Sequence, residues 1–135
     1  HGWGLTACDG PRGYSVNCPV RDRGVVAPTA ALSRMPFLLE EAEAALRAFI
    51  RFKGGALFSD CGFVDSFRPD GKWIASTHLA NNQGPIVAAI ENYRSGLLWS
   101  LFMQDEQVQT GLARLNIKIP YRGNYSSSVY NSNDH

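Results

Sequence analysis

The sequence predicts an all-α fold of about four helices joined by long loops. Two stretches, residues 38–53 and 85–103, repeat apolar side chains at the 3.6-residue period of a helix that buries one face. No run of alternating apolar and polar residues indicates a strand. The two long loops, residues 1–28 and 56–84, exceed the roughly 15 residues that are usual in a compact domain, and such loops are usually functional.

The composition indicates one domain and excludes several classes of partner. A chain of 135 residues with 44% hydrophobic content is large enough for a single domain with a core. A net charge of +1 and no basic stripe argue against nucleic acid, and no apolar run approaches the roughly 18 residues of a membrane span. We therefore expect neither nucleic acid nor a membrane as a partner. The sequence begins at His1 without an N-terminal leader, so we expect a processed product or a fragment.

The cysteines and histidines predict no metal site. Cys8, Cys18 and Cys61 give an odd count, which allows one disulfide with one free thiol or three thiols. Cys8 and Cys18 are close enough to close a small loop, but their spacing does not establish a bond. There is no CxxC pair and the three histidines are scattered, so we expect no metal and no cofactor.

The N-terminal half predicts two helices after an irregular loop. A short helix is expected over Thr29–Met35, because Pro36 would stop it. A second helix is expected over Leu38–Lys53, with acidic residues in its first turns and basic residues later, as the helix dipole favours. Gly54 and Gly55 should end it. Its apolar stripe comprises Leu39, Ala42, Leu46, Phe49 and Ile50.

The C-terminal half predicts a turn, a long helix and a short helix. Residues 69–71, Pro-Asp-Gly, are typical of a turn. The long helix is expected to begin at Pro85, which suits the first helical position, and to run to about Met103. Asp105 should cap a last helix over Glu106–Leu115. Residues 121–135 are rich in serine and asparagine and predict a flexible tail. The expected apolar face of the long helix comprises Ile86, Ile90, Tyr93, Leu97 and Leu101.

Both long loops place aromatic residues beside acids, which suits a carbohydrate cleft. Sugars stack their apolar faces on aromatic rings and pair their hydroxyls with acids and amides. The candidate aromatics are Trp3, Tyr14 and Trp73, each of which could instead belong to the core, while Phe63 and Phe67 are expected in the core. Asn82 and Gln83 precede the long helix, where they either contact a ligand or only cap the helix.

Four segments resemble, in order, a known family. Residues 2–14, 26–33, 62–67 and 82–103 read GWGLTACDGPRGY, VAPTAALS, GFVDSF and NQGPIVAAIENYRSGLLWSLFM. They resemble the WGxxAxDGPxGY, VAPTAALSS, YGFVDAF and DQGPIVxMIENYRTGLxWKLFM segments of the glucoamylase-like family of bacterial glycoside hydrolases. That family includes endo-β-1,2-glucanases of glycoside hydrolase family 144 and is related to domains of cyclic β-1,2-glucan synthases.

The resemblance implies an (α/α)6 toroid with a sugar cleft at one end and inverting hydrolysis. Residues 1–120 then correspond to the C-terminal part of such a toroid, and the general acid is expected upstream of His1. The polymeric substrate of the family implies a periplasmic or extracellular location in a bacterium. Whether the outcome is hydrolysis or transglycosylation stays open.

Asp65 and Asp9 are the candidate catalytic residues, because they are the acids in the matching loop segments; Glu91, in the helical segment, is expected to be structural support. We favour Asp65, since it lies between two phenylalanines that should desolvate its carboxyl group. Asp9 precedes Gly-Pro and could serve only as a turn residue. Relatives usually carry aspartate where this chain has Asn82, and an amide cannot act as a base. The candidate substrate-binding residues are Trp3, Tyr14, Trp73, Asn82 and Gln83.

Two functions are consistent with the sequence. The first is a segment of an inverting endo-β-1,2-glucanase that contributes part of the sugar cleft. Its expected partners are a β-glucan oligo- or polysaccharide and the N-terminal part of the same toroid as a second chain. The alternative is a non-catalytic helical module that binds a glycan or a protein and lacks the catalytic acid.

Overall fold

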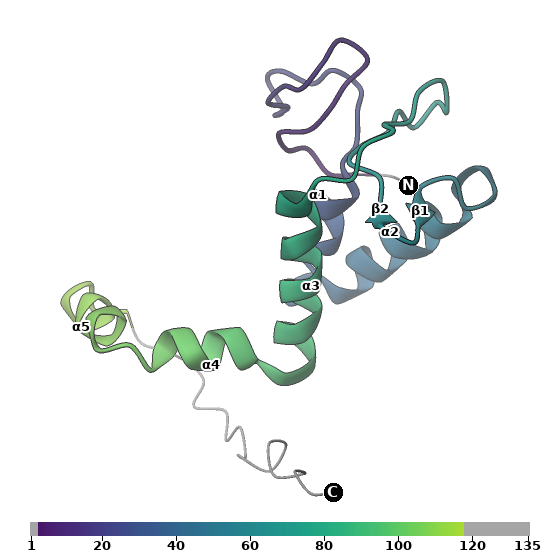
Figure 1. Cartoon of the computed structure of the whole chain (residues 1–135). Helices are drawn as coiled ribbons and strands as arrows, with labels where there is room; N and C mark the ends of the chain where they lie inside the picture. Colours follow the sequence, from purple (N-terminus) through teal and green to yellow (C-terminus); the bar gives the residue numbers. More distant parts are fainter. Residues whose placement is uncertain (1–2, 118–135) are drawn as a thin grey trace, which may run out of the picture.

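The computed structural model describes residues 3–117, which form a helix-rich fold (Figure 1). The 121–135 tail predicted above lies outside the described residues. The elements in chain order are α1 (Pro28–Leu32), α2 (Leu39–Arg51), a 3-10 turn η1 (Phe52–Gly54), β1 (Phe58–Ser59), β2 (Gly62–Phe63), α3 (Ala80–Ser95), α4 (Leu97–Met103) and α5 (Glu106–Arg114).

The short helix α1 packs against both α2 and α3 and holds the body of the fold together. The two long loops lie together beyond one end of α1 and α3, on the side away from α4 (Figure 1). At the other end of α3 the chain turns, and α4 and α5 extend away from the body as an arm (Figure 1). Helix α3 therefore carries the loops at its N-terminal end and the arm at its C-terminal end.

A small antiparallel sheet corrects the all-α prediction. Strands β1 and β2 pair Phe58 with Phe63 and Ser59 with Gly62. Each strand has two residues, which is too short for an alternating pattern to be recognised in the sequence. The fold is therefore helix-rich with one minor hairpin.

Aromatic side chains from α2 and the second loop form the centre of the core. Phe67 is 1% exposed, and its ring centroid lies 5.5 Å from that of Phe49 and 4.8 Å from that of Phe52. Phe63 is also buried and meets Phe49 edge-on. The prediction that Phe63 and Phe67 belong to the core is confirmed.

The first two helices are shorter than predicted, and the stripe of α2 differs in part. Helix α1 ends at Leu32, and turns rather than helix continue to residue 37. Helix α2 buries Ala42 and Phe49 as predicted, and also Ala45. Ile50 is 51% exposed, so its place on the buried stripe was wrong. The buried stripe of α2, which packs against α1, thus consists of Ala42, Ala45 and Phe49.

Helix α3 begins five residues before the predicted start and ends earlier. It starts at Ala80, so Pro85 is inside the helix rather than at its first position. The proline is tolerated there because its ring faces solvent in the second turn, where only one backbone hydrogen bond is lost. Gly96, with a φ of +67°, ends α3 in the left-handed region that favours glycine, and α4 starts at the next residue.

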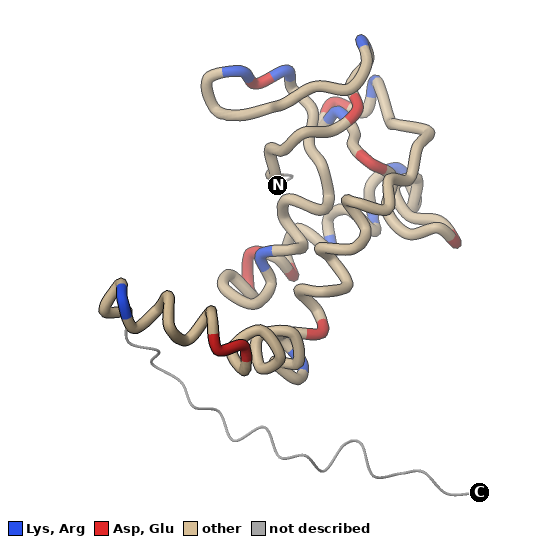
Figure 2. Tube along the Cα trace, turned by 60° about the vertical axis from the view of Figure 1, so that its left-hand side comes forward, with Lys and Arg blue, Asp and Glu red and all other residues tan. Residues whose placement is uncertain are grey.

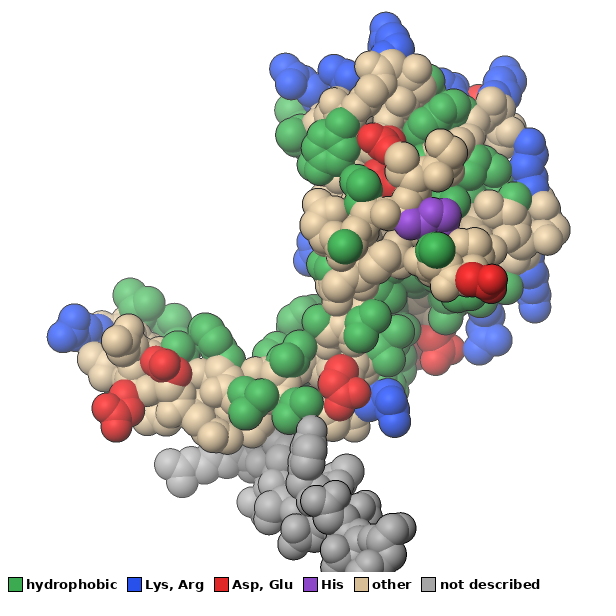
Figure 3. Space-filling view, in the orientation of Figure 1, with side chains coloured by type: hydrophobic (Ala, Val, Ile, Leu, Met, Phe, Trp, Pro, Cys, Tyr) green, Lys and Arg blue, Asp and Glu red, His purple; other side chains and the backbone are tan. Residues whose placement is uncertain are grey.

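This break leaves most of the predicted apolar face without a partner among residues 3–117. Ile86 is buried, but Tyr93 is 51% and Leu101 is 56% exposed. Hydrophobic side chains are visible along the arm in the space-filling view (Figure 3). Trp99 lies 5.7 Å from the ring of Phe37, which is itself largely exposed. An apolar surface of this kind is typical of a face that another part of a protein covers.

Two local predictions are confirmed. The Asp105 side chain accepts hydrogen bonds from the backbone N–H groups of Gln107 and Val108 and so caps α5. The turn at residues 69–71 forms, because the Gly71 N–H bonds to the Arg68 carbonyl at 2.8 Å.

Over residues 3–117, no helix combines the length and the apolar character that crossing a membrane requires.

We predict that Phe67→Ala lowers the free energy of unfolding by about 3–5 kcal/mol, because a fully buried aromatic side chain leaves a cavity. Urea unfolding followed by circular dichroism measures the change. Val20→Ala is the control: this side chain is 96% exposed, so its loss should change stability by less than about 0.5 kcal/mol. Equal midpoints for the two variants would show that the aromatic cluster is not the core of this fold.

Candidate functional site

The candidate site lies where the two long loops meet the first turns of α3. The loops are joined by paired backbone hydrogen bonds between Val26 and Phe67, at 2.8 and 2.9 Å. The second loop is closed on itself by the Asp65 N–H, which bonds to the Thr77 carbonyl at 2.9 Å. These contacts bring together segments that are far apart in the sequence. They place the two candidate acids, Asp9 and Asp65, close to each other near the first turns of α3.

Asp65 is the buried centre of the site. Its side chain is 1% exposed, and its Oδ2 accepts a hydrogen bond of 2.6 Å from the Asp9 backbone N–H. Its Oδ1 accepts a hydrogen bond from the Asn82 side-chain amide. Within residues 3–117 no Lys or Arg forms an ion pair with this carboxylate. The negative charge is therefore stabilised by two N–H donors, one from the first loop and one from α3.

Asp9 is the more accessible acid. The residue is partly exposed, and its Oδ2 accepts a hydrogen bond from the Thr77 hydroxyl. Its backbone is held from both sides, because its carbonyl also accepts a bond of 2.6 Å from the Ser66 hydroxyl. The structure thus fixes the position of Asp9 through its main chain and leaves one side of the carboxylate open.

Asn82 and Gln83 join α3 to the second loop and do not cap the helix. The N-cap residue is Leu79, and no side chain caps the helix there. Asn82 is 9% exposed and donates to Asp65. Gln83 donates through Nε2 to the Phe63 carbonyl at 2.6 Å. The capping interpretation was wrong, because the helix begins earlier and these amides point to residues 63–65 instead.

The three candidate aromatics differ in their surroundings. Trp3 is partly buried against the main core, and Trp73 is partly buried against Cys8, Val25 and Ala27. Tyr14 is 54% exposed on the first loop. Trp73 thus packs against the loop that carries Asp9, whereas the Tyr14 side chain is exposed to solvent.

Sequence reasoning missed the hydroxyl groups of Ser66 and Thr77. Ser66 follows Asp65 directly in a segment that resembles the family, so its position gave a weak signal. Thr77 and Asp9 are 68 residues apart and lie in no common motif, so no local pattern could connect them.

The three cysteines are free thiols, which settles the alternatives left open above. Burial raises the pKa of the Cys8 thiol, which keeps it neutral and makes it a small core residue. Among the described residues no three His, Cys, Asp or Glu side chains gather in a way that could hold a metal ion.

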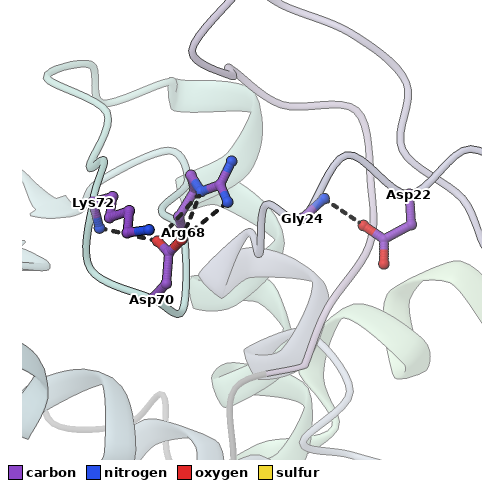
Figure 4. A network of polar contacts seen from close by, with 5 residues as sticks. All are labelled: Asp22, Gly24, Arg68, Asp70 and Lys72. Atoms are coloured by element: carbon purple, nitrogen blue, oxygen red, sulfur yellow. Dashed lines mark hydrogen bonds and ion pairs between the residues drawn. The ribbon is translucent and has the colours of Figure 1, made fainter.

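A polar network stabilises the outer parts of both loops (Figure 4). Asp70 accepts hydrogen bonds from the Arg68 guanidinium, the shortest at 3.0 Å, and from the Lys72 backbone N–H at 3.0 Å. The Arg68 hydrogen bond, followed by that from Lys72, lowers the pKa of Asp70. Asp22 accepts from the Gly24 N–H at 2.7 Å. Both acids are engaged in local turns and are not part of the Asp9–Asp65 site.

We predict that Asn82→Asp destabilises the protein at pH 7 by about 3 kcal/mol, because it sets a second carboxylate against the buried Asp65.

The control is the same change in an Asp65→Asn background, where amide and carboxylate have exchanged places and the hydrogen bond can form again. Denaturant unfolding of the four proteins gives the coupling energy between the two positions. Additive effects at pH 7 would show that the two side chains do not meet in the folded state.

Comparisons with known proteins support the resemblance seen in the sequence. Residues 1–106 match the model of the Glycoamylase family, described as "Putative glucoamylase". A crystal structure of a "putative glucoamylase" from Bacteroides uniformis is 50% identical with a TM-score of 0.78, over 84% of this chain and 28% of that one. An endo-β-1,2-glucanase from Chitinophaga pinensis, in complex with sophorotriose and glucose, is 43% identical with a TM-score of 0.76 over the same shares.

A curated relative, the exo β-1,2-glucooligosaccharide sophorohydrolase of Parabacteroides distasonis, is 39% identical over 115 residues. The match covers 84% of this chain and 16% of that protein. The chain thus spans only 16–28% of the length of these relatives. Because the family model matches most of the sequence, the chain belongs to the Glycoamylase family.

Proposed function

We propose that this chain is the segment of an inverting endo-β-1,2-glucanase that contributes part of the sugar cleft. The observation that carries the proposal is the convergence of Asp9, Asp65 and Asn82 at one end of α3. All three lie in segments that resemble the family, and two of the relatives named above act on β-1,2-glucans. A periplasmic or extracellular location of the enzyme is part of this proposal.

The geometry favours different roles for the two acids. An inverting glycosidase needs two carboxyl groups about 6.5–9.5 Å apart, one to protonate the leaving oxygen and one to activate water. Asp9 is the acid whose carboxylate is partly open, so it can meet water or a sugar hydroxyl. We assign it the role of base, or of ligand to a sugar hydroxyl. Thr77 orients the carboxylate through its hydroxyl.

Asp65 acts as a positioning residue in this proposal. At 1% exposure its carboxylate has no surface to offer to a sugar, but it holds the Asp9 backbone in place. Asn82 connects α3 to the same carboxylate, because its side-chain amide donates a hydrogen bond to Asp65. This assignment reverses our preference from the sequence, because Asp65 is buried so completely that its carboxylate has no exposed surface for a substrate.

The remaining parts of the cleft are proposed to come from outside this segment. The general acid would be supplied by another part of the toroid, in the same polypeptide or in a second chain. Among the three candidate aromatics, Tyr14 is the most available for stacking on a sugar, and Trp73 supports the loop beside it. Gln83 is proposed to contribute by holding residues 62–63 close to the helix.

A second candidate is a glycan-binding module without catalysis. It is favoured by the burial of Asp65 and by the amide at position 82, which together leave Asp9 as the open carboxylate of the cluster. Binding and catalysis therefore need separate tests.

Binding is tested by titrating the 135-residue chain with sophorotriose while recording amide NMR spectra. We expect saturable shifts around Asp9 and Thr77 and weaker shifts with a β-1,4-linked trisaccharide. Asp9→Ala should weaken binding about tenfold, the loss of a charge-assisted hydrogen bond. Asp60→Asn alters an exposed acid in the β1–β2 turn and should change nothing. Shifts that are absent, or equally affected in both variants, would remove this site from glycan binding.

Catalysis is tested by native mass spectrometry followed by a hydrolysis assay on linear β-1,2-glucan. A mass above 14.8 kDa would identify an accompanying polypeptide in which to seek the acid. In the active assembly, Asp9→Asn should lower kcat about 10²–10⁴-fold, the usual contribution of a general base. A folded 14.8 kDa species that binds sophorotriose without hydrolysing it would favour the binding module instead.

A further inference from the structure

A second concave site lies on the outer side of the loop that carries Asp9. It is a pocket of about 240 Å³, smaller than the roughly 300–1,000 Å³ of sites for drug-sized ligands. Three of its lining residues are arginines, Arg12, Arg23 and Arg68, and none is acidic. The pocket is therefore small, and its charged lining residues are all basic.

The arginines reach the pocket from three separate segments. Figure 2 shows the basic positions along the upper loops that surround this region. Arg68 is held in place by its bidentate contact with Asp70, at 3.0–3.3 Å (Figure 4). Within residues 3–117, Arg12 and Arg23 form no ion pair. One guanidinium is thus fixed and two are available.

The acid closest in sequence, Asp22, forms no ion pair with these arginines within residues 3–117. Asp22 precedes Arg23, but its carboxylate accepts the Gly24 N–H within a local turn (Figure 4). The floor of the pocket is apolar, because Val25 is 1% exposed. Two arginines without an ion-pair partner among the described residues, Arg12 and Arg23, thus line the pocket beside Arg68, which Asp70 already binds.

We infer that this pocket binds an oxyanion, either a free phosphate or carboxylate or one carried by a saccharide. The planar guanidinium presents paired N–H donors that match the oxygens of a phosphate or carboxylate, and Arg12 and Arg23 have no carboxylate partner within residues 3–117 to compete for theirs. Its small volume fits an anionic group with at most a small attached residue.

The pocket is connected to the candidate sugar site through one tight loop. Backbone hydrogen bonds of 3.0 Å between Cys8 and Ser15 close this loop, and Gly13 bonds to Gly10 at 2.9 Å inside it. Asp9 therefore lies next to Gly10, which lines the pocket. A saccharide at Asp9 could place an anionic substituent in the pocket, and this saccharide-carried case rests on the proposed function.

The experiment titrates the 135-residue chain with inorganic phosphate, glucose 6-phosphate and glucose at constant ionic strength, with amide NMR as the readout. We expect saturable shifts of Gly10, Gly13 and Gly24 with both phosphates and none with glucose. Arg12→Gln and Arg23→Gln should each weaken binding about tenfold. The control is Arg47→Gln, which removes an exposed arginine already paired with Glu43 on α2.

The outcomes separate the two sources of the oxyanion. Equal affinity for both phosphates supports a free-oxyanion site, whereas tighter binding of glucose 6-phosphate supports an anion carried by a saccharide. Shifts that do not saturate, or an equal loss in Arg47→Gln, overturn the inference. If sophorotriose shifts Asp9 and Thr77 while phosphate shifts nothing, this inference fails and the proposed function stands. Phosphate binding without sophorotriose binding would support this inference and contradict the proposed function.

Discussion

The fold around the site depends on one buried carboxylate. A negative charge that is 1% exposed, with no Lys or Arg paired to it within residues 3–117, is costly unless N–H groups satisfy it. Asp65 finds these donors 56 residues earlier, at Asp9, and 17 residues later, at Asn82. Neither loop can take its position without the other, and both need the first turns of α3. The hydrogen bonds from Ser66 and Gln83 reinforce the same junction.

This junction explains how an irregular region can hold a site in place. The loops contain few repeating backbone hydrogen bonds, so their positions depend on side chains that reach across long sequence distances. Because the anchoring acid is buried, the partly exposed Asp9 is held through its main chain and its carboxylate remains partly free. A substitution at Asp9 would therefore alter the chemistry of the site directly. A substitution at Asp65 would first alter the position of the Asp9 backbone. The two roles follow from exposure and not from residue type.

The sequence predicted the elements whose signals are local. Helix α2 with its terminal glycines, the Asp105 cap and the turn at residues 69–71 each formed near the expected residues. The start of α3 was misplaced because Leu79 gives no capping signal and Pro85 gives a false one. Asp9 and Asp65 could be named from their motifs. Their contact, and that of Asp9 with Thr77, could not be predicted, because burial and pairing across 56 to 68 residues leave no periodic trace.

The exposed arm follows from the same helix that supports the site. Helix α3 presents the junction at its N-terminal end and, after Gly96, a series of apolar side chains in α4 with Trp99, Leu101 and Phe102 largely in water. Fully burying an exposed side chain of this kind contributes about 1.5–3 kcal/mol, and these side chains, already about half buried, would contribute less each, so a covering surface would stabilise α4 through their sum. The hydrogen bonds of the junction, by contrast, lie wholly among residues 9–83. Covering the arm should therefore stabilise the assembly without rearranging Asp9, which makes the local geometry of the site informative for the complete toroid that we propose.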